Sequence, residues 1–177
     1  VAGIGGIPVT RFRYLPRRWR RLAYGSGILP NLRRRPLLWL QVPFFMVSMT
    51  IALFRLTRKL RPQVIHAHWV LPQGLIAVFV GKLTRVPVVV TLHGGDAFAL
   101  KSGPLSWLKR AALTHAAAWT ANTGATANAL RMTDGMPSPY IIPMGVDVKR
   151  FAGGHRETYR QDIPAKDLVI LFVGRLV

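Results

Sequence analysis

Cysteine is absent from all 177 residues of the chain. This absence excludes disulfide bonds, a thiol nucleophile and a thiolate metal site together, and it suits a reducing compartment. Half of the residues are apolar, which is enough to fill the core of one domain of ordinary size. Neither a disulfide-bonded mini-protein nor a disordered tail is expected.

Acidic residues are also scarce. Six Asp and Glu stand against 25 Lys and Arg, which gives a net charge of +19, and all six acids lie at or beyond Asp96. The segment from Arg11 to Arg61 alone holds 13 basic residues. A paired-carboxylate site is therefore excluded from the first half of the chain. The imbalance predicts an anionic partner, whether nucleic acid, an acidic lipid surface or a phosphorylated ligand.

Several signatures of enzymes and of secretion are missing. The chain has no initiator methionine, signal peptide, P-loop or Ser-His-Asp order, and Gly3 to Gly6 precede a strand instead of following one. Hydrolase, P-loop and dinucleotide-dependent dehydrogenase functions therefore lose their main support. The apolar run Leu168–Val177 predicts a buried parallel strand, which needs neighbouring strands. We expect the chain to be a piece of a longer one, cut at both ends.

Hydrophobic patterns predict alternating strands and helices in the second part of the chain. An earlier strand is expected at Ile7–Tyr14, followed by a long arginine-rich loop. The later strands are expected at Val64–His68, Val86–Leu92, Ala116–Ala121 and Tyr140–Ile142, and the helices at Pro72–Arg85, Pro104–His115 and Thr123–Met132. This order predicts an α/β fold, a Rossmann-like parallel sheet with helices on both faces.

The segment Leu37–Phe54 has eighteen residues without a charge, inside a helix predicted from Pro36 to Lys59. Eighteen is about the lower limit for a membrane-spanning helix. Gln41, Pro43, Ser48 and Thr50 interrupt the apolar run, and basic clusters on both flanks give no positive-inside asymmetry. A helix that packs on the sheet or lies at a membrane surface is therefore favoured over a span.

Polar or glycine-rich turns follow the four later strands. They are His66 to Trp69, His93 to Asp96, Asn122 to Gly124 and Pro143 to Asp147. Because ligands bind at the carboxyl ends of parallel strands, we expect these turns to line one cleft. Gly94 and Gly95 allow close backbone approach to a ligand, and the imidazole of His93 can bind a hydroxyl or phosphate. Alternatively, the turn is structural and Asp96 caps the next segment.

Two further interpretations stay open from the residues alone. His66 and His68 share one face of a strand, which permits a metal pair, but a buried histidine bonded to the backbone is favoured. Gly174 and Arg175 follow the last apolar run, where a guanidinium either binds phosphate or is solvated.

Four motifs occur in an order that points to one enzyme family. They are the segments Val64–Gly74, Val90–Asp96, Ile142–Asp147 with Phe151, and Leu171–Leu176. Together they resemble the GT-B glycosyltransferases of family 4, which are retaining enzymes built from two Rossmann-like domains. The resemblance implies transfer of a sugar, with retention, from a nucleotide-sugar donor to a lipid-linked or polysaccharide acceptor.

The resemblance also implies roles for individual residues. His93 corresponds to the cleft histidine that contacts the transferred sugar and is the expected catalytic residue. The implied substrate-binding positions are His66, Trp69, Gly94, Gly95, Asp96, Asn122 and Gly145. Gly174 and Arg175 are implied at the donor pyrophosphate. No cofactor or metal is expected, because Arg175, a following lysine and helix-start amides would stabilise the leaving diphosphate.

The resemblance divides the chain into three parts. Residues 1–151 are expected to form the acceptor-side domain without its first strand, residues 152–167 a linker, and residues 168–177 the first strand of a donor-binding domain. The family's opening glycine-rich loop, its partner lysine and its Glu-x7-Glu motif do not occur in these 177 residues. We therefore expect the chain by itself to be inactive.

Two other classes of function remain as alternatives. Aromatic residues interleaved with arginines suggest a nucleic-acid-binding module; they are Phe12, Tyr14, Trp19 and Tyr24. A non-enzymatic protein anchored through Leu37–Phe54 is the other. Neither explains four ordered motifs, so nucleic acid is not favoured. We expect a bacterial, cytoplasmic enzyme held peripherally on the inner face of the cell membrane through the basic Arg11–Arg61 region.

Overall fold

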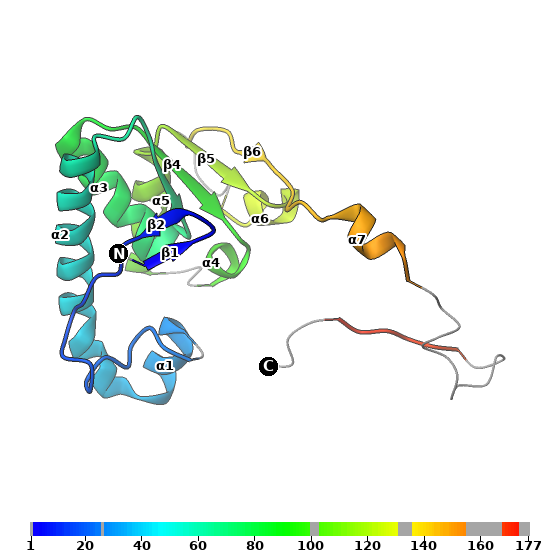
Figure 1. The fold of residues 1–177 in the computed structure, drawn as a ribbon, viewed down its shortest axis with the longest axis horizontal. Coiled ribbons are helices and arrows are strands. Elements are labelled where there is room, and N and C mark those ends of the chain that lie inside the picture. Colours follow the sequence, from blue (N-terminus) through cyan, green and yellow to red (C-terminus); the bar gives the residue numbers. More distant parts are fainter. Residues whose placement is uncertain (1, 26, 100–102, 131–135, 155–167, 174–177) are drawn as a thin grey trace. The chain divides into compact units, whose positions relative to one another are not determined.

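The computed structural model describes residues 2–25, 27–99, 103–130, 136–154 and 168–173 (Figure 1). The chain divides into two compact units, Val1–Pro143 and Met144–Val177. This division falls after Pro143, ahead of the boundary predicted at residue 151.

The first unit is built around a four-stranded parallel sheet with the order β3-β4-β5-β6. The strands are β3 (Ile65–His68), β4 (Val88–Leu92), β5 (Ala118–Ala121) and β6 (Tyr140–Ile141). All four predicted strands of this region are therefore present, slightly shorter than expected. A parallel sheet with helical crossovers confirms the predicted Rossmann-like α/β fold. The helices that connect these four strands lie on one face of the sheet, whereas helices were predicted on both faces.

Side chains alternate between the two faces of the sheet. In β3, Ile65 and Ala67 are buried, whereas His66 and His68 are exposed. The register places His68 beside the half-buried Thr91 of β4, so the less buried positions of the two strands lie on the same face. One face of the sheet is thus apolar and forms the core, and the other carries polar side chains.

The helices between the strands pack against the apolar face. The elements are η2 (Val70–Gly74), α3 (Leu75–Thr84), α4 (Gly95–Phe98), α5 (Pro104–Thr114) and α6 (Gly124–Asn128). Each crossover leads to the next strand in the same direction, so right-handed connections place their helices on one side. The core joins Val80 of α3, Leu113 of α5 and Ala127 of α6 to Val90 and Trp119 of the sheet.

Local sequence explains where these helices begin. Pro104 starts α5, since a missing N–H costs nothing in the first turn. Thr123 caps α6, because its side chain accepts a hydrogen bond from the Thr126 N–H. The helix predicted from Pro72 begins at Leu75, after the short π-helical segment η2. Residues 131–135, which include the end of the helix predicted to Met132, lie outside the described residues.

The N-terminus forms a short antiparallel hairpin of β1 (Ala2–Ile4) and β2 (Ile7–Val9). Its turn consists of Gly5 and Gly6, both with positive φ, as a two-residue hairpin turn requires. The strand predicted to reach Tyr14 was too long, because its three-residue partner ends the ladder at Val9.

The helix predicted from Pro36 to Lys59 consists of two elements. A 3₁₀ helix, η1 (Pro36–Gln41), leads into the α-helix α2 (Val42–Leu60). Pro43 lies in the first turn of α2, where it starts the helix instead of interrupting it. Figure 1 shows α2 along one side of the unit, and α3 packs against it.

A second, smaller core lies beside α2 and α1 (Ile28–Arg34). Its buried members are Tyr14, Leu22, Leu32, Leu38 and Phe45. The predicted arginine-rich loop is therefore an ordered segment with apolar anchors of its own.

The second unit contains the short helix α7 (Val148–Ala152), which is capped by Asp147. The apolar residues Leu168–Val173 form no strand, and their side chains are exposed. The assignment of residues 168–177 to the first strand of a donor-binding domain stays a prediction, because the strands that would pair with it belong to that domain. Residues 174–177 lie outside the described part of the chain.

Candidate active site

Asp96 joins the carboxyl ends of two neighbouring strands. Its Oδ2 accepts a hydrogen bond of 3.0 Å from the Val70 N–H, just after β3. Its Oδ1 accepts one of 3.0 Å from the His93 N–H, just after β4. The residue is buried, and charge-assisted bonds of this kind are among the stronger ones in proteins. Asp96 thereby positions both turns, which supports the structural interpretation of this residue.

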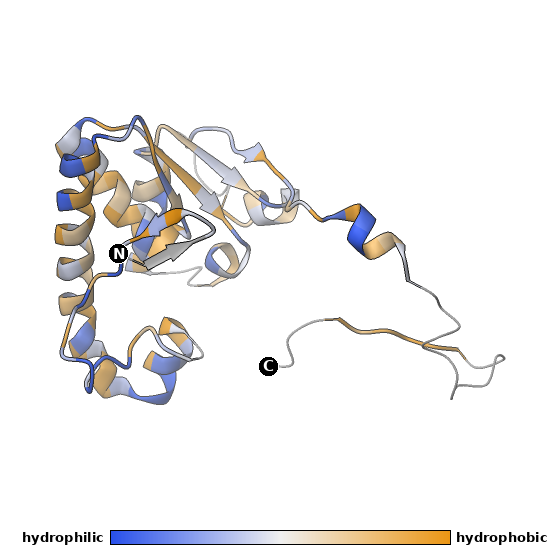
Figure 2. Cartoon of the chain, in the orientation of Figure 1, coloured by the Kyte–Doolittle hydropathy of each residue, from blue (hydrophilic) through white to orange (hydrophobic). Residues whose placement is uncertain are grey.

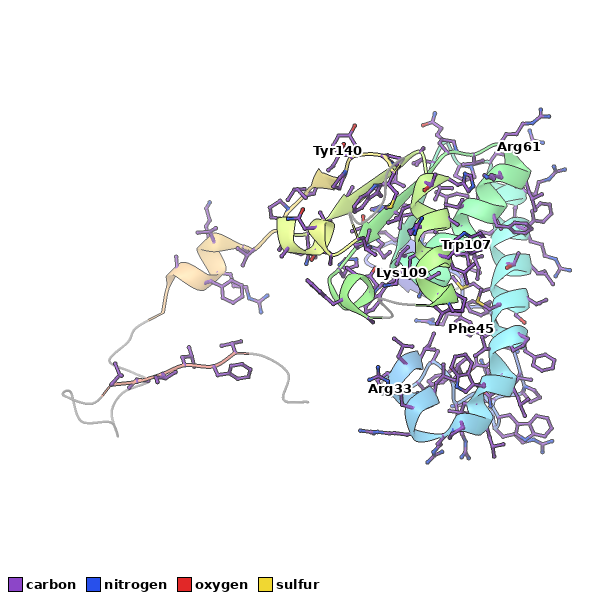
Figure 3. All side chains as sticks on the ribbon, turned by 180° about the vertical axis from the view of Figure 1, so that it is seen from behind. Arg33, Phe45, Arg61, Trp107, Lys109 and Tyr140 are labelled. Carbon is purple, nitrogen blue, oxygen red and sulfur yellow. The ribbon has the colours of Figure 1, made fainter. Side chains whose placement is uncertain are left out.

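A buried lysine supports the same turn from the other side. Lys109 of α5 is only 1% exposed, and Figure 3 labels it on that helix. Its ammonium group donates to the carbonyl oxygens of Asp96 at 2.9 Å, of Ala97 at 3.3 Å and of Ala99. These carbonyls belong to the short helix α4 and its end, where a positive charge is favourable. Lys109 thus stabilises the segment that carries His93 and Asp96.

Three histidine rings form a row on the polar face of the sheet. The ring centroids of His66 and His68 are 4.4 Å apart, and those of His68 and His93 are 5.1 Å apart. His68 Nδ1 lies 2.9 Å from His93 Nε2, a hydrogen-bond distance. His66 Nε2 lies 2.7 Å from Thr91 Oγ1, which in turn lies 2.7 Å from Thr120 Oγ1. Among the described residues, nothing hydrogen-bonds the Nδ1 of His93.

The two neighbouring histidines affect the protonation of His68. The pKa of His68 is lowered from its ordinary value of 6.5 by partial desolvation of the ring, although the residue as a whole is exposed, and then by the nearby charges of His66 and His93. A neutral His68 can either donate to or accept from His93, so the pair holds the second ring in a set orientation.

Trp69 lies beside this row in an unusual backbone conformation. Its φ of +76° is in the left-handed region, which a tryptophan rarely adopts. Two backbone hydrogen bonds hold it there: its N–H donates to Thr91 O, and its carbonyl accepts from the Gly74 N–H, both at 2.9 Å. Backbone strain of this kind often marks functional sites. The residue is 45% exposed, and its ring centroid is 6.3 Å from that of His93.

The two glycines of the turn permit close neighbours. A Cβ added to Gly95 would lie 3.6 Å from the Trp69 ring, so the ring lies over this glycine. Gly94 has a φ of +95°, and an added Cβ would lie 3.6 Å from Thr126 Oγ1. Thr126 donates to Asn122 Oδ1 at 2.9 Å, so the turn after β5 meets the turn after β4.

The structure therefore brings most of the predicted site residues together. The members that gather at the carboxyl edge are His66, Trp69, His93, Gly94, Gly95, Asp96 and Asn122. Gly145 belongs to the other unit, where it is exposed. Gly174 and Arg175 lie outside the described residues.

One detail of the histidine prediction was wrong. Neither His66 nor His68 is a buried residue bonded to the backbone, because both are exposed and bond to side chains. Within the described ranges, no group of three or more His, Asp or Glu side chains is arranged to hold a metal ion.

Sequence reasoning missed two participants. The sequence analysis treats His68 as one of a metal pair or as a buried histidine, and not as a partner of His93, although its position two residues after His66 places it on the same face. Lys109 was overlooked, although it shares the apolar side of its helix with Ala112 and Leu113. A lysine at a core position of a predicted helix indicates a buried hydrogen-bonding role, since lysine is rarely buried without a partner.

The arginine-rich segment does not form a continuous stacking surface for bases. Tyr14 is buried, and its ring packs edge-on against Phe45 with centroids 5.2 Å apart. Phe12 packs on the same ring at 5.1 Å. Trp19 is exposed, with the guanidinium of Arg18 over it at 5.3 Å. Two of the four aromatic residues considered for nucleic acid thus stabilise the smaller core.

The fold and its carboxyl edge define a Rossmann-like domain with an ordered polar edge. A family model described as Glycosyltransferase Family 4 matches residues 6–150. The putative teichuronic acid biosynthesis glycosyltransferase TuaC of Bacillus subtilis (strain 168) is 30% identical over 127 residues. That alignment covers 68% of this chain and 32% of TuaC, so the chain spans about a third of the length of this relative. The chain belongs to glycosyltransferase family 4, and its first unit is a GT-B glycosyltransferase domain.

Proposed function

We propose that this chain supplies the acceptor-side domain of a retaining, hexosyltransferase-type enzyme. The enzyme transfers a sugar from a nucleotide-sugar donor to a lipid-linked or polysaccharide acceptor. The observation that carries this proposal is the fixed orientation of His93, whose backbone N–H is bound by Asp96 and whose Nε2 lies against His68. The name of TuaC, which refers to teichuronic acid biosynthesis, supports a polysaccharide product.

The edge has the chemistry that a sugar ring needs. The unengaged Nδ1 of His93 offers a hydrogen bond to a hydroxyl group of the transferred sugar. The exposed ring of Trp69 offers an apolar face to the C–H groups of a sugar. His66 and Asn122 extend the polar lining on either side, and the small size of Gly94 and Gly95 lets Thr126 and the Trp69 ring lie close to the backbone of this edge.

Charge on the leaving diphosphate belongs to the donor side of the proposed reaction. Gly174 and Arg175 are the residues of this chain that we assign to it, and a guanidinium suits two-point binding of phosphate. The proposed enzyme uses fixed positive groups and backbone amides at this position in place of a metal. We place it in the cytoplasm, where it works on the inner face of the cell membrane.

The test compares two histidines in the complete enzyme, assayed with a panel of nucleotide sugars. His93→Ala should lower kcat by about 100-fold or more, because it removes a bond that stabilises the transition state, and should change the acceptor KM much less. His115→Ala, at an exposed position after α5, should leave both unchanged. Equal and small effects of His93→Ala on both constants would show that His93 is structural. NMR of the new glycosidic bond then tests retention, and an inverted product contradicts it.

A further inference from the structure

The outer face of the segment formed by η1 and α2 is an apolar stripe open to solvent. Its members recur at alternating steps of three and four residues, as one side of a helix requires. They are Leu37, Leu40, Phe44, Val47, Ile51 and Phe54, which we name the outer stripe. Their side chains are between 37% and 81% exposed. Figure 2 shows this long apolar helix between hydrophilic ends.

The opposite face of α2 packs against the rest of the folded domain. Phe45 is buried in the smaller core, Met46 and Leu53 pack against the main core, and Met49 contacts both. Thr57, near the end of the helix, is buried as well. At 3.6 residues per turn these positions lie on the side away from the outer stripe. The helix is therefore attached to the folded domain along most of its length.

Because α2 is attached to the folded domain, an arrangement on the membrane surface is favoured over one that spans the membrane. By length and composition alone, Pro36–Leu60 is long and apolar enough to cross a membrane. A span would carry the attached sheet and the arginine-rich segment into the hydrocarbon region, where exposed charges are strongly disfavoured. A helix that lies in the plane of the membrane exposes only its outer stripe to lipid and keeps the domain in water.

Positive charge lies at both ends of the stripe. Arg33, Arg34 and Arg35 precede it, and all three are exposed. Arg55, Arg58, Lys59 and Arg61 are exposed around and beyond its other end. Figure 3 labels Arg33 on α1, which lies beside one end of α2, and Arg61 at the other end of α2. Since no carboxylate occurs before Asp96, nothing acidic in this part of the sequence neutralises them.

We infer that the outer stripe binds an anionic lipid bilayer, with α2 parallel to the surface and the two basic clusters on lipid phosphates. An apolar face flanked by basic residues matches a surface whose interior is hydrocarbon and whose exterior is negative. The inference rests on α2 and its flanks alone. It therefore stands or falls independently of the proposed sugar transfer.

The first experiment measures sedimentation of the chain with vesicles of phosphatidylcholine, with and without phosphatidylglycerol. Phe44→Ser with Ile51→Ser should weaken binding to the anionic vesicles by about tenfold or more, because apolar contact is lost. The matched control is Tyr140→Ser with Ile142→Ser, an equally exposed aromatic and isoleucine from β6 and the residue after it. The control should bind as the wild type does. Equal binding by both double variants would overturn the inference.

The second experiment tests the charges. Arg33→Gln, Arg34→Gln and Arg35→Gln together should weaken binding to anionic vesicles by ~100-fold, with little change on neutral ones. Three exposed cations elsewhere, substituted in the same way, provide the control; they are Lys82, Arg85 and Arg110. The loss should also appear in wild type at high salt. Charge variants that bind both kinds of vesicle like the wild type would contradict the role of lipid phosphate.

Other occupants of the stripe give different results. A chain that stays in membranes after alkaline carbonate extraction is a span, and this overturns the surface arrangement. A dimer in solution that dissociates in the Phe44→Ser and Ile51→Ser variant, together with absence of vesicle binding, assigns the stripe to a second copy. Loss of thermal stability by this variant in the complete enzyme, without vesicle binding, assigns it to another part of that enzyme.

Discussion

In both the carboxyl edge of the sheet and the arginine-rich segment, one side chain holds the backbone through several hydrogen bonds; it accepts them in the first region and donates them in the second. At the edge, the carboxylate of Asp96 gathers backbone N–H groups from two turns. In the segment, the amide nitrogen of Asn31 gathers carbonyl oxygens instead, from Arg21, Leu22 and Tyr24, at 3.2, 3.0 and 2.7 Å. The acid-free half of the chain thus has a neutral amide where the other half has an ion.

The two regions differ in what their anchors present to a ligand. Around Asp96, the fixed backbone aims two aromatic side chains, Trp69 and His93, at the edge of the sheet. Around Asn31, the fixed backbone leaves arginines on the surface, and Gln41 adds a hydrogen bond of 2.9 Å to Trp19 O. The net charge therefore describes the surface of one region, whereas the proposed site lies in the other. Net charge informs on partners and not on the proposed site.

Removing the ionic anchor should have the largest effect. Asp96→Ala leaves two backbone N–H groups without their acceptor in a buried place, and each such loss costs about 1–3 kcal/mol. We expect the free energy of unfolding to fall by about 3 kcal/mol, measured by urea denaturation. Asp147→Ala removes a comparable carboxylate contact, to the Arg150 N–H, from an exposed helix end. It should cost about 1 kcal/mol or less. Equal losses of unfolding free energy in the two variants would show that burial does not strengthen the contribution of Asp96.

Removing the neutral anchor should have a smaller and more local effect. Asn31→Ala deletes the donor shared by three carbonyls that are partly exposed, so we expect a loss of about 1–2 kcal/mol. The measurement is the rate of tryptic cleavage between Arg17 and Arg21, which should rise as the segment opens. Asn128→Ala, at an exposed position in α6, is the control. Unchanged cleavage in Asn31→Ala would mean that the smaller core alone holds the segment.

Sequence reasoning succeeded where local pattern is sufficient. The alternation in Ile65–His68 and the β-branched run before His93 identify strands, and the order of strands and helices leads to a parallel sheet. The turn residues gather because carboxyl ends of parallel strands share an edge. What the pattern did not contain was the pairing of Val70 with Asp96, which depends on contacts between residues 26 positions apart.

The misses have physical causes of the same kind. The contact of Lys109 with the end of α4 joins two helices whose packing is not encoded in the period of either one. The apolar run at 168–173 forms no strand in this chain, because a parallel strand also needs neighbouring strands, which a local pattern does not specify. The helix α2 shows that an apolar pattern does not specify which face is buried. The sequence predicts a helix that packs on the sheet, lies at a membrane surface or spans it, and in the structure one face of α2 is buried and the outer stripe is exposed.

The smallest effect we expect is a pH dependence of the free energy of unfolding, which comes from His68 at the carboxyl edge. The lowered pKa of His68 means that the unfolded chain binds this proton more tightly than the folded chain does. As the pH falls from 6.5 toward the folded pKa, the unfolded state takes up the proton first, so stability decreases; above this range the contribution of neutral His68 is complete. His68→Gln should remove this part of the slope in denaturation experiments, whereas His115→Gln should keep it. An NMR titration midpoint for His68 at or above 6.5 would show that its ring is not held neutral beside His93.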